Sequence, residues 1–143
     1  MIDFLPGVKS TTAALTAERI RMDVISQNIA NANTTQGPDG KPYQRQEVVF
    51  ESVLSQQVAD PSNVLPQPVQ VARIQSDNRP PQMVYRPGHP NADKNGMVAM
   101  PNINIHEEMA DLITSSRAFE ANLAVIKNAQ AMALQSLSIG RRA

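Results

Sequence analysis

The sequence contains few residues whose type and spacing could support catalysis. The strongest candidate is the run His106-Glu107-Glu108, which places an imidazole beside two carboxylates. Adjacent residues on a helix point about 100° apart, whereas zinc motifs place two ligands four residues apart on one face. The three side chains therefore should not converge on a metal or a substrate. We interpret the run as a polar first turn of a helix, where the helix dipole favours carboxylates.

The other candidates for chemistry are weaker. His89 and Asp93 lie in a proline-rich segment without a third ligand nearby, so no metal site is expected there. The chain has no Cys, which excludes disulfides, thiolate metal ligands and a cysteine nucleophile. Its serines lack the G-x-S-x-G elbow of hydrolases, and no Gly-rich phosphate loop occurs. We therefore predict no enzymatic activity, no catalytic residue, no metal and no cofactor.

Composition limits which partners and which cellular location are expected. The chain has 143 residues with 13 basic and 13 acidic side chains, so it carries no net charge that would attract nucleic acid. Nothing in it indicates a small-molecule substrate. The first residues lack the basic and apolar regions of a Sec signal peptide. The aliphatic run at residues 123–126 is too short to cross a bilayer. On these observations alone a cytoplasmic protein is expected.

Proline and glycine divide the chain into three parts. No Pro or Gly occurs between Gly7 and Gly37 or between Pro101 and Gly140, whereas residues 37–101 hold most of the 11 prolines. Because proline disrupts helix interiors, the sequence predicts a mainly α protein. We expect an N-terminal helix in residues 1–36, a β-rich or extended middle segment in residues 37–101 and a C-terminal helix in residues 102–143.

The first helix is predicted from about Lys9 to Asn33. Apolar residues recur every seven positions along it, with further residues in the intervening row. They are Val8, Leu15, Met22 and Ile29 in the main row, and Ile25 and Ala32 in the second.

The second helix is predicted from Asn104 to Ile139, a length of about 54 Å. Asn104 can cap its start together with Glu107, and Gly140 marks its end. Its residues follow an alternating spacing of four and three, which is typical of a coiled-coil seam. That seam comprises Ile105, Met109, Leu112, Ser116, Phe119, Leu123, Ile126, Gln130, Ala133 and Leu137.

The ends of the two predicted helices lack charge. Residues 24–38 and 128–140 contain no charged side chain, and around residues 131–134 apolar side chains point in every direction. A helix that is apolar on all sides is buried on all sides, and a single partner helix cannot achieve that. We therefore expect several neighbouring copies to surround these ends. In the free subunit the terminal segments should be largely disordered and become helical on assembly.

The middle segment shows strand and turn patterns. Residues 44–50 and 69–74 alternate as β-strands do, and the run Pro38-Asp39-Gly40 predicts a turn. From Asn78 to Asn102, prolines and polar residues predict an extended connector.

Four stretches together resemble a known family. They are SQNIANANTT from residue 26, GKPYQRQEVVFE from residue 40, HPNADKNGMV from residue 89 and PNINIHEEMADLITSSRAFEANLAVIKNAQAMALQSLSIGR from residue 101. These stretches resemble the basal-body rod proteins of the bacterial flagellum, and most closely those of the proximal rod. The asparagine-rich stretch alone is shared among rod and hook subunits, whereas the combination is specific.

The resemblance implies a function and a location. In this family the terminal helices pair as a coiled coil, and copies pack helically around an export channel to form a torque-transmitting shaft. The implied partners are copies of the chain, other proximal and distal rod proteins and an export-gate or membrane-ring adaptor at the base. The resemblance also implies a place in the rod within the periplasm, reached through the flagellar type III system without a cleaved signal. This replaces the cytoplasmic expectation.

The same resemblance suggests which residues meet neighbouring subunits. Asn28, Asn31 and Asn33 are predicted at subunit contacts, and Asn33 is also predicted to adopt the left-handed conformation that ends a helix. The alternative is that these asparagines only terminate a surface helix. The full set of predicted subunit-interface and coiled-coil residues is Val8, Leu15, Met22, Ile25, Asn28, Ile29, Asn31, Asn33, Ile105, Met109, Leu112, Phe119, Leu123, Ile126, Ala133 and Leu137.

A second function fits the same helices. A secreted coiled-coil adaptor, or a protein like a type III translocator, would bind one partner helix through these seams.

Overall fold

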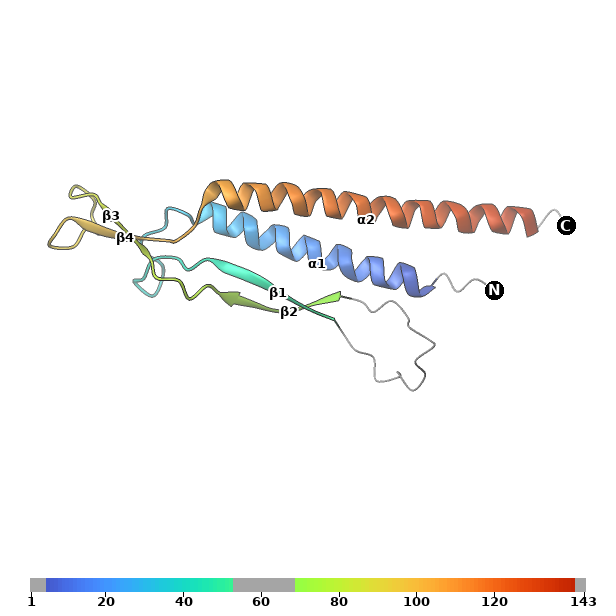
Figure 1. Cartoon of the computed structure of the whole chain (residues 1–143), viewed down its shortest axis with the longest axis horizontal. Helices are drawn as coiled ribbons and strands as arrows, with labels where there is room; N and C mark the ends of the chain where they lie inside the picture. The colour runs from blue at the N-terminus through green and yellow to red at the C-terminus, as the bar shows by residue number, and fades with distance from the viewer. Residues whose placement is uncertain (1–4, 53–68, 141–143) are drawn as a thin grey trace.

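The computed structural model of the chain describes residues 5–52 and 69–140 and contains two long helices with four short strands between them. Helix α1 spans Leu5–Ala30 and helix α2 spans Ile105–Gly140. The helices lie side by side and run in opposite directions, with the start of α1 and the end of α2 at the same end of an elongated molecule (Figure 1). The prediction of two terminal helices and a small strand-containing middle is confirmed.

Helix α1 begins four residues earlier than predicted. Pro6 lies in its first turn, where the missing N–H would have no partner within the helix in any case. The helix ends at Ala30 and continues into a turn in which the Thr34 N–H donates to the Asn31 carbonyl over 3.0 Å. No residue other than glycine has a positive φ in the described ranges, so the prediction of a left-handed Asn33 is wrong. Hydrogen bonds of the turn use the last carbonyls without a left-handed residue.

Helix α2 begins as predicted. The Asn104 Oδ1 accepts from the His106 N–H over 3.1 Å, and the Asn104 Nδ2 donates to Glu107 Oε1 over 2.9 Å. The helix has 36 residues against 26 in α1, which corresponds to about 54 Å against about 39 Å. Its last ten residues, 131–140, are all exposed. None of the helices in the described residues is long and apolar enough to cross a membrane.

The first two strands form a ribbon that lies against α1. Strand β1 (Gln46–Ser52) pairs antiparallel with strand β2 (Val69–Ser76), with a register shift between Val49 and Phe50, and both strands contact α1. Both predicted strands are therefore confirmed. The predicted turn before them is also present, because the Gly40 N–H donates to the Gly37 carbonyl over 3.0 Å and Gly40 has φ 71°.

A second hairpin replaces part of the predicted connector. Strand β3 (Gln82–Tyr85) pairs antiparallel with strand β4 (Met97–Met100), so the prediction of an extended connector throughout residues 78–102 is wrong there, because the chain folds back on itself as a paired hairpin. The prolines flank these strands rather than interrupt them, so they remove no hydrogen bond from the ladder. The Asp93 Oδ1 accepts from the N–H groups of Asn95 and Met97, each over 2.8 Å, and so shapes the loop between the strands.

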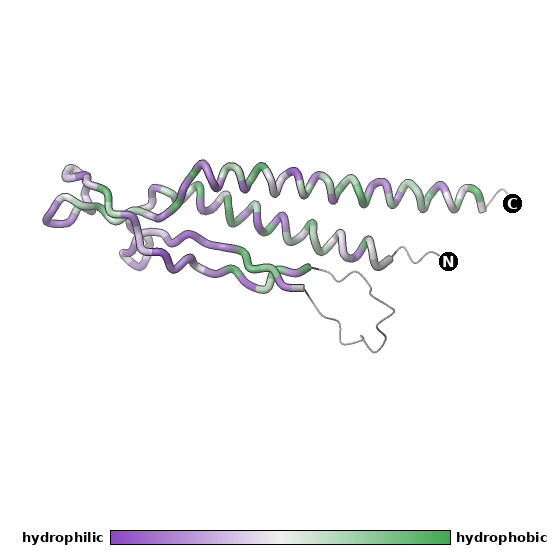
Figure 2. Tube along the Cα trace, in the orientation of Figure 1, coloured by the Kyte–Doolittle hydropathy of each residue, from purple (hydrophilic) through white to green (hydrophobic). Residues whose placement is uncertain are grey.

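The two helices meet along a seam that differs from the predicted one at alternate positions. Glu108, Ser115, Asn122 and Ala129 follow one another at seven-residue steps; Asn122 is half-buried and the other three are buried. The sequence pattern predicts instead the residue after each of them, which gives Met109, Ser116, Leu123 and Gln130. Leu112, Phe119 and Ile126 are half-buried and belong to both patterns. Hydrophobic and hydrophilic positions recur along both helices (Figure 2). Several apolar residues of α2, Met109 and Leu137 among them, are exposed and lie outside this seam.

Gly96 allows a test of the β3–β4 hairpin. Its φ is 73°, and a Cβ at this position would lie 2.9 Å from Tyr85 Cε2. Gly96→Ala should therefore open the hairpin, with a loss of about 1–3 kcal/mol from the strained backbone alone. We expect faster hydrogen exchange of the Arg86 amide, which donates to the Gly96 carbonyl. Gly88→Ala is the control, because Gly88 has no positive φ and an added Cβ meets open space. Equal exchange in both variants would contradict this account of the hairpin.

Candidate assembly surface

A buried amide joins three elements at one end of the helix pair. The Asn28 side chain of α1 is 1% exposed. Its Nδ2 donates to the Gln46 carbonyl of β1 over 2.9 Å and to Glu108 Oε2 of α2 over 3.1 Å. Its Oδ1 accepts from the Gln46 N–H over 2.9 Å and from the Tyr43 hydroxyl over 3.1 Å. An amide can make four such bonds, two as donor and two as acceptor, and Asn28 makes all four.

The buried carboxylate of Glu108 is compensated by Arg45. Glu108 is 1% exposed, and its Oε1 accepts from Arg45 Nε over 2.7 Å. The same guanidinium also donates to Glu47 Oε1 over 2.6 Å. Burial lowers the pKa of Arg45, but the hydrogen bonds and charges of Glu108 and Glu47 together outweigh it, so this pKa is raised overall. We call Asn28, Tyr43, Arg45, Gln46 and Glu108 the polar cluster.

Burial also changes the pKa of Tyr43. Desolvation makes the larger contribution to raising the pKa of its hydroxyl, and the negative charge of Glu108 raises it further.

A second ion pair lies beside the cluster, where Arg79 NH2 and Asp77 Oδ2 are 2.6 Å apart. The hydrogen bonds from Arg79 lower the pKa of the Asp77 carboxyl. The Asp77 N–H donates to the Arg45 carbonyl over 2.7 Å, so a backbone hydrogen bond joins this ion pair to Arg45 of the polar cluster.

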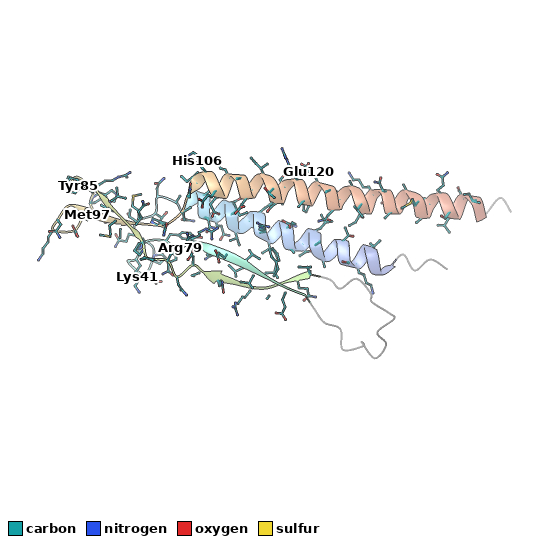
Figure 3. The ribbon with its side chains drawn as sticks, viewed as in Figure 1. Lys41, Arg79, Tyr85, Met97, His106 and Glu120 are labelled. Atoms are coloured by element: carbon teal, nitrogen blue, oxygen red, sulfur yellow. The ribbon has the colours of Figure 1, made fainter. Side chains whose placement is uncertain are left out.

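The structure separates the residues that first suggested chemistry. His106 and Glu120 project from α2 away from α1 (Figure 3), whereas Glu108 points inward to the polar cluster. His89 Nδ1 accepts from the Asn91 N–H, and Asp93 is bonded within its own loop. Across residues 5–52 and 69–140, no three His, Cys, Asp or Glu side chains lie together as a metal site requires.

The three predicted interface asparagines have different surroundings. Asn28 bonds entirely within the chain. Asn31 donates to the Gln27 carbonyl over 2.9 Å and accepts from the Thr34 hydroxyl over 3.2 Å, and Asn33 is exposed. The role of these asparagines in subunit contacts stays a prediction.

The other predicted interface residues fall into two groups. In α1, Ile25 is buried, and Val8, Leu15, Met22 and Ile29 are half-buried. In α2, the residues outside the seam are exposed: Ile105 37%, Met109 51%, Leu123 36%, Leu137 66%, and also Ala133. The single chain leaves these side chains available to neighbours, and their interface role stays a prediction.

Most of the large exposed apolar residues of α2 form two flanks, one on each side of the seam. The residues of flank 1 are Ile105, Met109, Leu123 and Leu134, and those of flank 2 are Val125, Met132 and Ile139. At about 100° per residue, each flank lies roughly 100° from the direction of Ser115, in opposite senses. Their exposed fractions run from 36% to 65%. The helix therefore presents two separate apolar surfaces.

Sequence reasoning missed the polar cluster and flank 2. Glu108 looked like a polar residue of the first helical turn, and its partner Arg45 lies 63 residues away, so no local signal connects them. Flank 2 did carry a signal, because Val125, Met132 and Ile139 recur every seven residues.

Comparisons with known proteins give a consistent result. The family described as flagella basal body rod protein matches residues 11–38, and the C-terminal family of the flagellar basal body rod FlgEFG proteins matches residues 94–139. The flagellar basal-body rod protein FlgC of Borreliella burgdorferi is 40% identical over 93% of this chain and 95% of its own length. The proteins of that name from Salmonella typhimurium and Bacillus subtilis are 37% and 35% identical, over 90% and 92% of this chain and 92% and 94% of their own lengths.

Asn28 allows a test of the polar cluster. Asn28→Ala leaves the Gln46 N–H and Glu108 Oε2 without their partner, so we expect a loss of about 2–3 kcal/mol in the free energy of unfolding. Urea unfolding of the purified chain, followed by circular dichroism, measures this loss. Asn33→Ala is the matched control and should change stability by less than about 0.5 kcal/mol, because Asn33 is exposed. Equal effects of the two changes would refute the role given to Asn28.

Tyr43 predicts a dependence on alkaline pH. Because its pKa is raised in the folded chain, its contribution to stability is complete below about pH 10 and is lost as the pH rises through the folded pKa. Unfolding midpoints in urea should therefore fall as the pH rises above about 10. Tyr43→Phe should reduce this fall, whereas Tyr85→Phe should not, since Tyr85 is 67% exposed. An unchanged alkaline profile in Tyr43→Phe would contradict the assignment.

Proposed function

The chain belongs to the family of flagellar basal-body rod proteins, within its FlgC group, and is a structural subunit of the proximal rod; on this premise we propose that the two flanks of α2 join it to its neighbours in the rod. The observation that carries the proposal is the apolar surface left on α2 by the single chain. A contiguous exposed apolar surface on a soluble chain marks a protein contact.

The arrangement of the flanks determines the kind of polymer. Flank 1 and flank 2 are different surfaces on opposite sides of one helix, so flank 1 of one copy can pack against flank 2 of the next. Such a contact is heterologous, and repeated it gives a ring or a helix rather than a closed dimer. The methionines in both flanks suit this use, because a flexible thioether adapts to neighbours that are not equivalent.

The seam between α1 and α2 acts as the internal support of this surface. We propose that the pair is a coiled coil of the rod type, with α1 against the Glu108–Ala129 seam and both flanks of α2 outward. The polar cluster holds the end of the pair at Asn28 and Glu108. Residues 131–140 have no such tie and are all exposed. Helix formation on assembly is therefore proposed for this end of α2 in particular.

The finer expectations on partners and location follow the family and are part of the same proposal. The chain would contact other rod proteins and an adaptor of the membrane ring or export gate, within the periplasm, after export by the flagellar type III system without cleavage. It would act without catalysis, as a shaft that transmits torque. The comparisons do not support the alternative of a secreted adaptor or translocator-like protein.

Substitutions on flank 2 test the proposal. Val125→Asp together with Met132→Asp should abolish rod assembly and motility, because a carboxylate buried at a subunit contact without a partner costs several kcal/mol. Motility in soft agar and electron microscopy of isolated basal bodies measure the effect, with immunoblots to confirm that the variant is produced.

Ala124→Asp is the matched control. It introduces the same charge one residue from Val125, on the side of α2 that carries Arg117, Glu120 and Lys127. We expect motility to be retained. Normal rods in the flank 2 double variant would rule out this surface as a subunit contact.

A further inference from the structure

The chain contains a single Asn-Gly dipeptide, Asn95-Gly96, in the loop between β3 and β4. Asparagine followed by glycine is the dipeptide that loses its side-chain amide most readily without an enzyme. Glycine has no Cβ to crowd its own nitrogen, and it allows the backbone rotations that bring this nitrogen to the asparagine side chain. Asn95 is exposed, so water reaches it. The loop therefore carries a candidate site of spontaneous modification.

The reaction needs only water and hydroxide. The Gly96 nitrogen, after losing its proton to hydroxide, attacks Asn95 Cγ. The Cγ–Nδ2 bond breaks, and Nδ2 takes up a proton from water and leaves as ammonia. Water then opens the cyclic imide at one of its two carbonyl carbons and leaves either aspartate or isoaspartate. The net change exchanges water for ammonia, without oxidation or reduction.

The folded loop keeps the attacking nitrogen occupied. The Gly96 N–H donates to the Asp93 carbonyl over 3.0 Å, so its proton is held away from hydroxide. The Asn95 N–H donates to Asp93 Oδ1 over 2.8 Å, which fixes the backbone on the other side of the dipeptide. A hydrogen-bonded amide exchanges its proton only when the structure opens locally. Asn95 should therefore react only through an opened loop.

Further contacts oppose that opening. Asp93 Oδ1 also accepts from the Met97 N–H, and the Asp93 N–H donates to the Met97 carbonyl, each over 2.8 Å. The Arg86 N–H donates to the Gly96 carbonyl over 2.8 Å. The Tyr85 ring packs against the glycine backbone, where an added Cβ would lie 2.9 Å from Tyr85 Cε2. Asp93 is thus the residue on which the hydrogen bonds around the dipeptide converge.

We propose that Asn95 is a latent deamidation site and that Asp93 is the positioning residue that keeps it unreactive. Asn95 is converted to aspartate or isoaspartate only in chains whose loop opens. The rate follows the population of the open loop, because the loop closes again faster than the chemical step proceeds. This inference goes beyond the proposed function and does not depend on it, since it concerns the single folded chain.

The second labile dipeptide of the chain is held in the same way. Asp39-Gly40 is its single Asp-Gly pair, which forms the same cyclic imide by loss of water. The Gly40 N–H donates to the Gly37 carbonyl over 3.0 Å, and Gly40 has φ 71° against 73° for Gly96. Turns of this kind favour Asn or Asp beside a glycine at positive φ. The residues that suit the turn thus create the labile pair, and the hydrogen bond across the turn protects it.

Conversion to isoaspartate would disrupt the hairpin. The backbone would then run through the side chain of residue 95 and gain one carbon atom shortly before β4. Met97 is the first residue of β4 and pairs with Tyr85, so a longer backbone displaces this first pair. The register of the hairpin turns Val98 inward, where it is 1% exposed. A transient opening would become a lasting change in the structure.

Mass spectrometry of the purified full chain tests the proposal. Wild type and Asp93→Ala are incubated at mildly alkaline pH and then digested with pepsin in acid, which stops the reaction. Chromatography separates the aspartate and isoaspartate products. Loss of the two bonds that the Asp93 carboxylate accepts should raise the deamidation rate of Asn95 about ten-fold or more.

Two controls accompany this comparison. Asp93→Asn is the matched conservative variant, because its amide oxygen still accepts both bonds, and its rate should stay within about two-fold of wild type. Asn102, which precedes the branched Ile103, is the internal control in every sample and should not change. Wild type in concentrated urea gives the rate of the open loop, which should be much faster than the rate in buffer.

Each outcome bears on the proposal. Equal rates for wild type in buffer and in urea would show that the fold does not protect Asn95. A slower rate in Asp93→Ala would show that the carboxylate acts as a base on the Gly96 N–H, which would overturn the role given to Asp93, and so would an unchanged rate. If Asp93→Ala does not fold, wild type at rising urea below its unfolding transition decides. Deamidation should then increase together with hydrogen exchange of the Gly96 amide, and a constant deamidation rate would equally overturn the proposal.

Discussion

The hydrogen bonds between Asn28, Glu108 and Arg45 fix the arrangement on which the rest of the molecule depends. A carboxylate buried to 1% exposure is costly unless its oxygens are occupied, and here both are, by Asn28 Nδ2 and Arg45 Nε. With Glu108 turned inward, helical geometry also turns Ser115, Asn122 and Ala129 toward α1, because they follow at seven-residue steps. The apolar residues beside them, Met109 and Leu123 among them, are then turned outward.

This arrangement explains how a chain without net charge can fold and still bind neighbouring subunits. The buried α2 positions of the intrachain seam carry small or polar side chains, and the larger Leu112, Phe119 and Ile126 are only half-buried there. Most of the large apolar side chains of α2 are left on the two flanks, where the chain itself does not cover them. A subunit of this kind gains most from association with neighbours, in agreement with a structural role in the rod.

The sequence was sufficient for the helices, for β1 and β2, for the cap at Asn104 and for the turn at Gly40, because each depends on neighbouring residues. It was insufficient for the helix seam. The alternating spacing of four and three favours Met109, Ser116 and Leu123, whereas the observed positions depend on Asn28 and Arg45, which lie 80 and 63 residues from Glu108. It also missed β3 and β4, because proline-rich composition concealed two short strands lying between the prolines. The role of Asn28 as a link within the chain could not be read from a stretch that equally suits a subunit contact.

The central claim is that the flanks of α2 are open in the single chain and become covered in the rod. Maleimide labelling of Met132→Cys, in a chain with no other Cys, measures this directly when the purified subunit is compared with isolated rods. The account predicts markedly slower labelling in rods at Met132→Cys, and little change at Ala124→Cys on the charged side of the helix. Equal labelling rates at Met132→Cys in the free and assembled forms would contradict it.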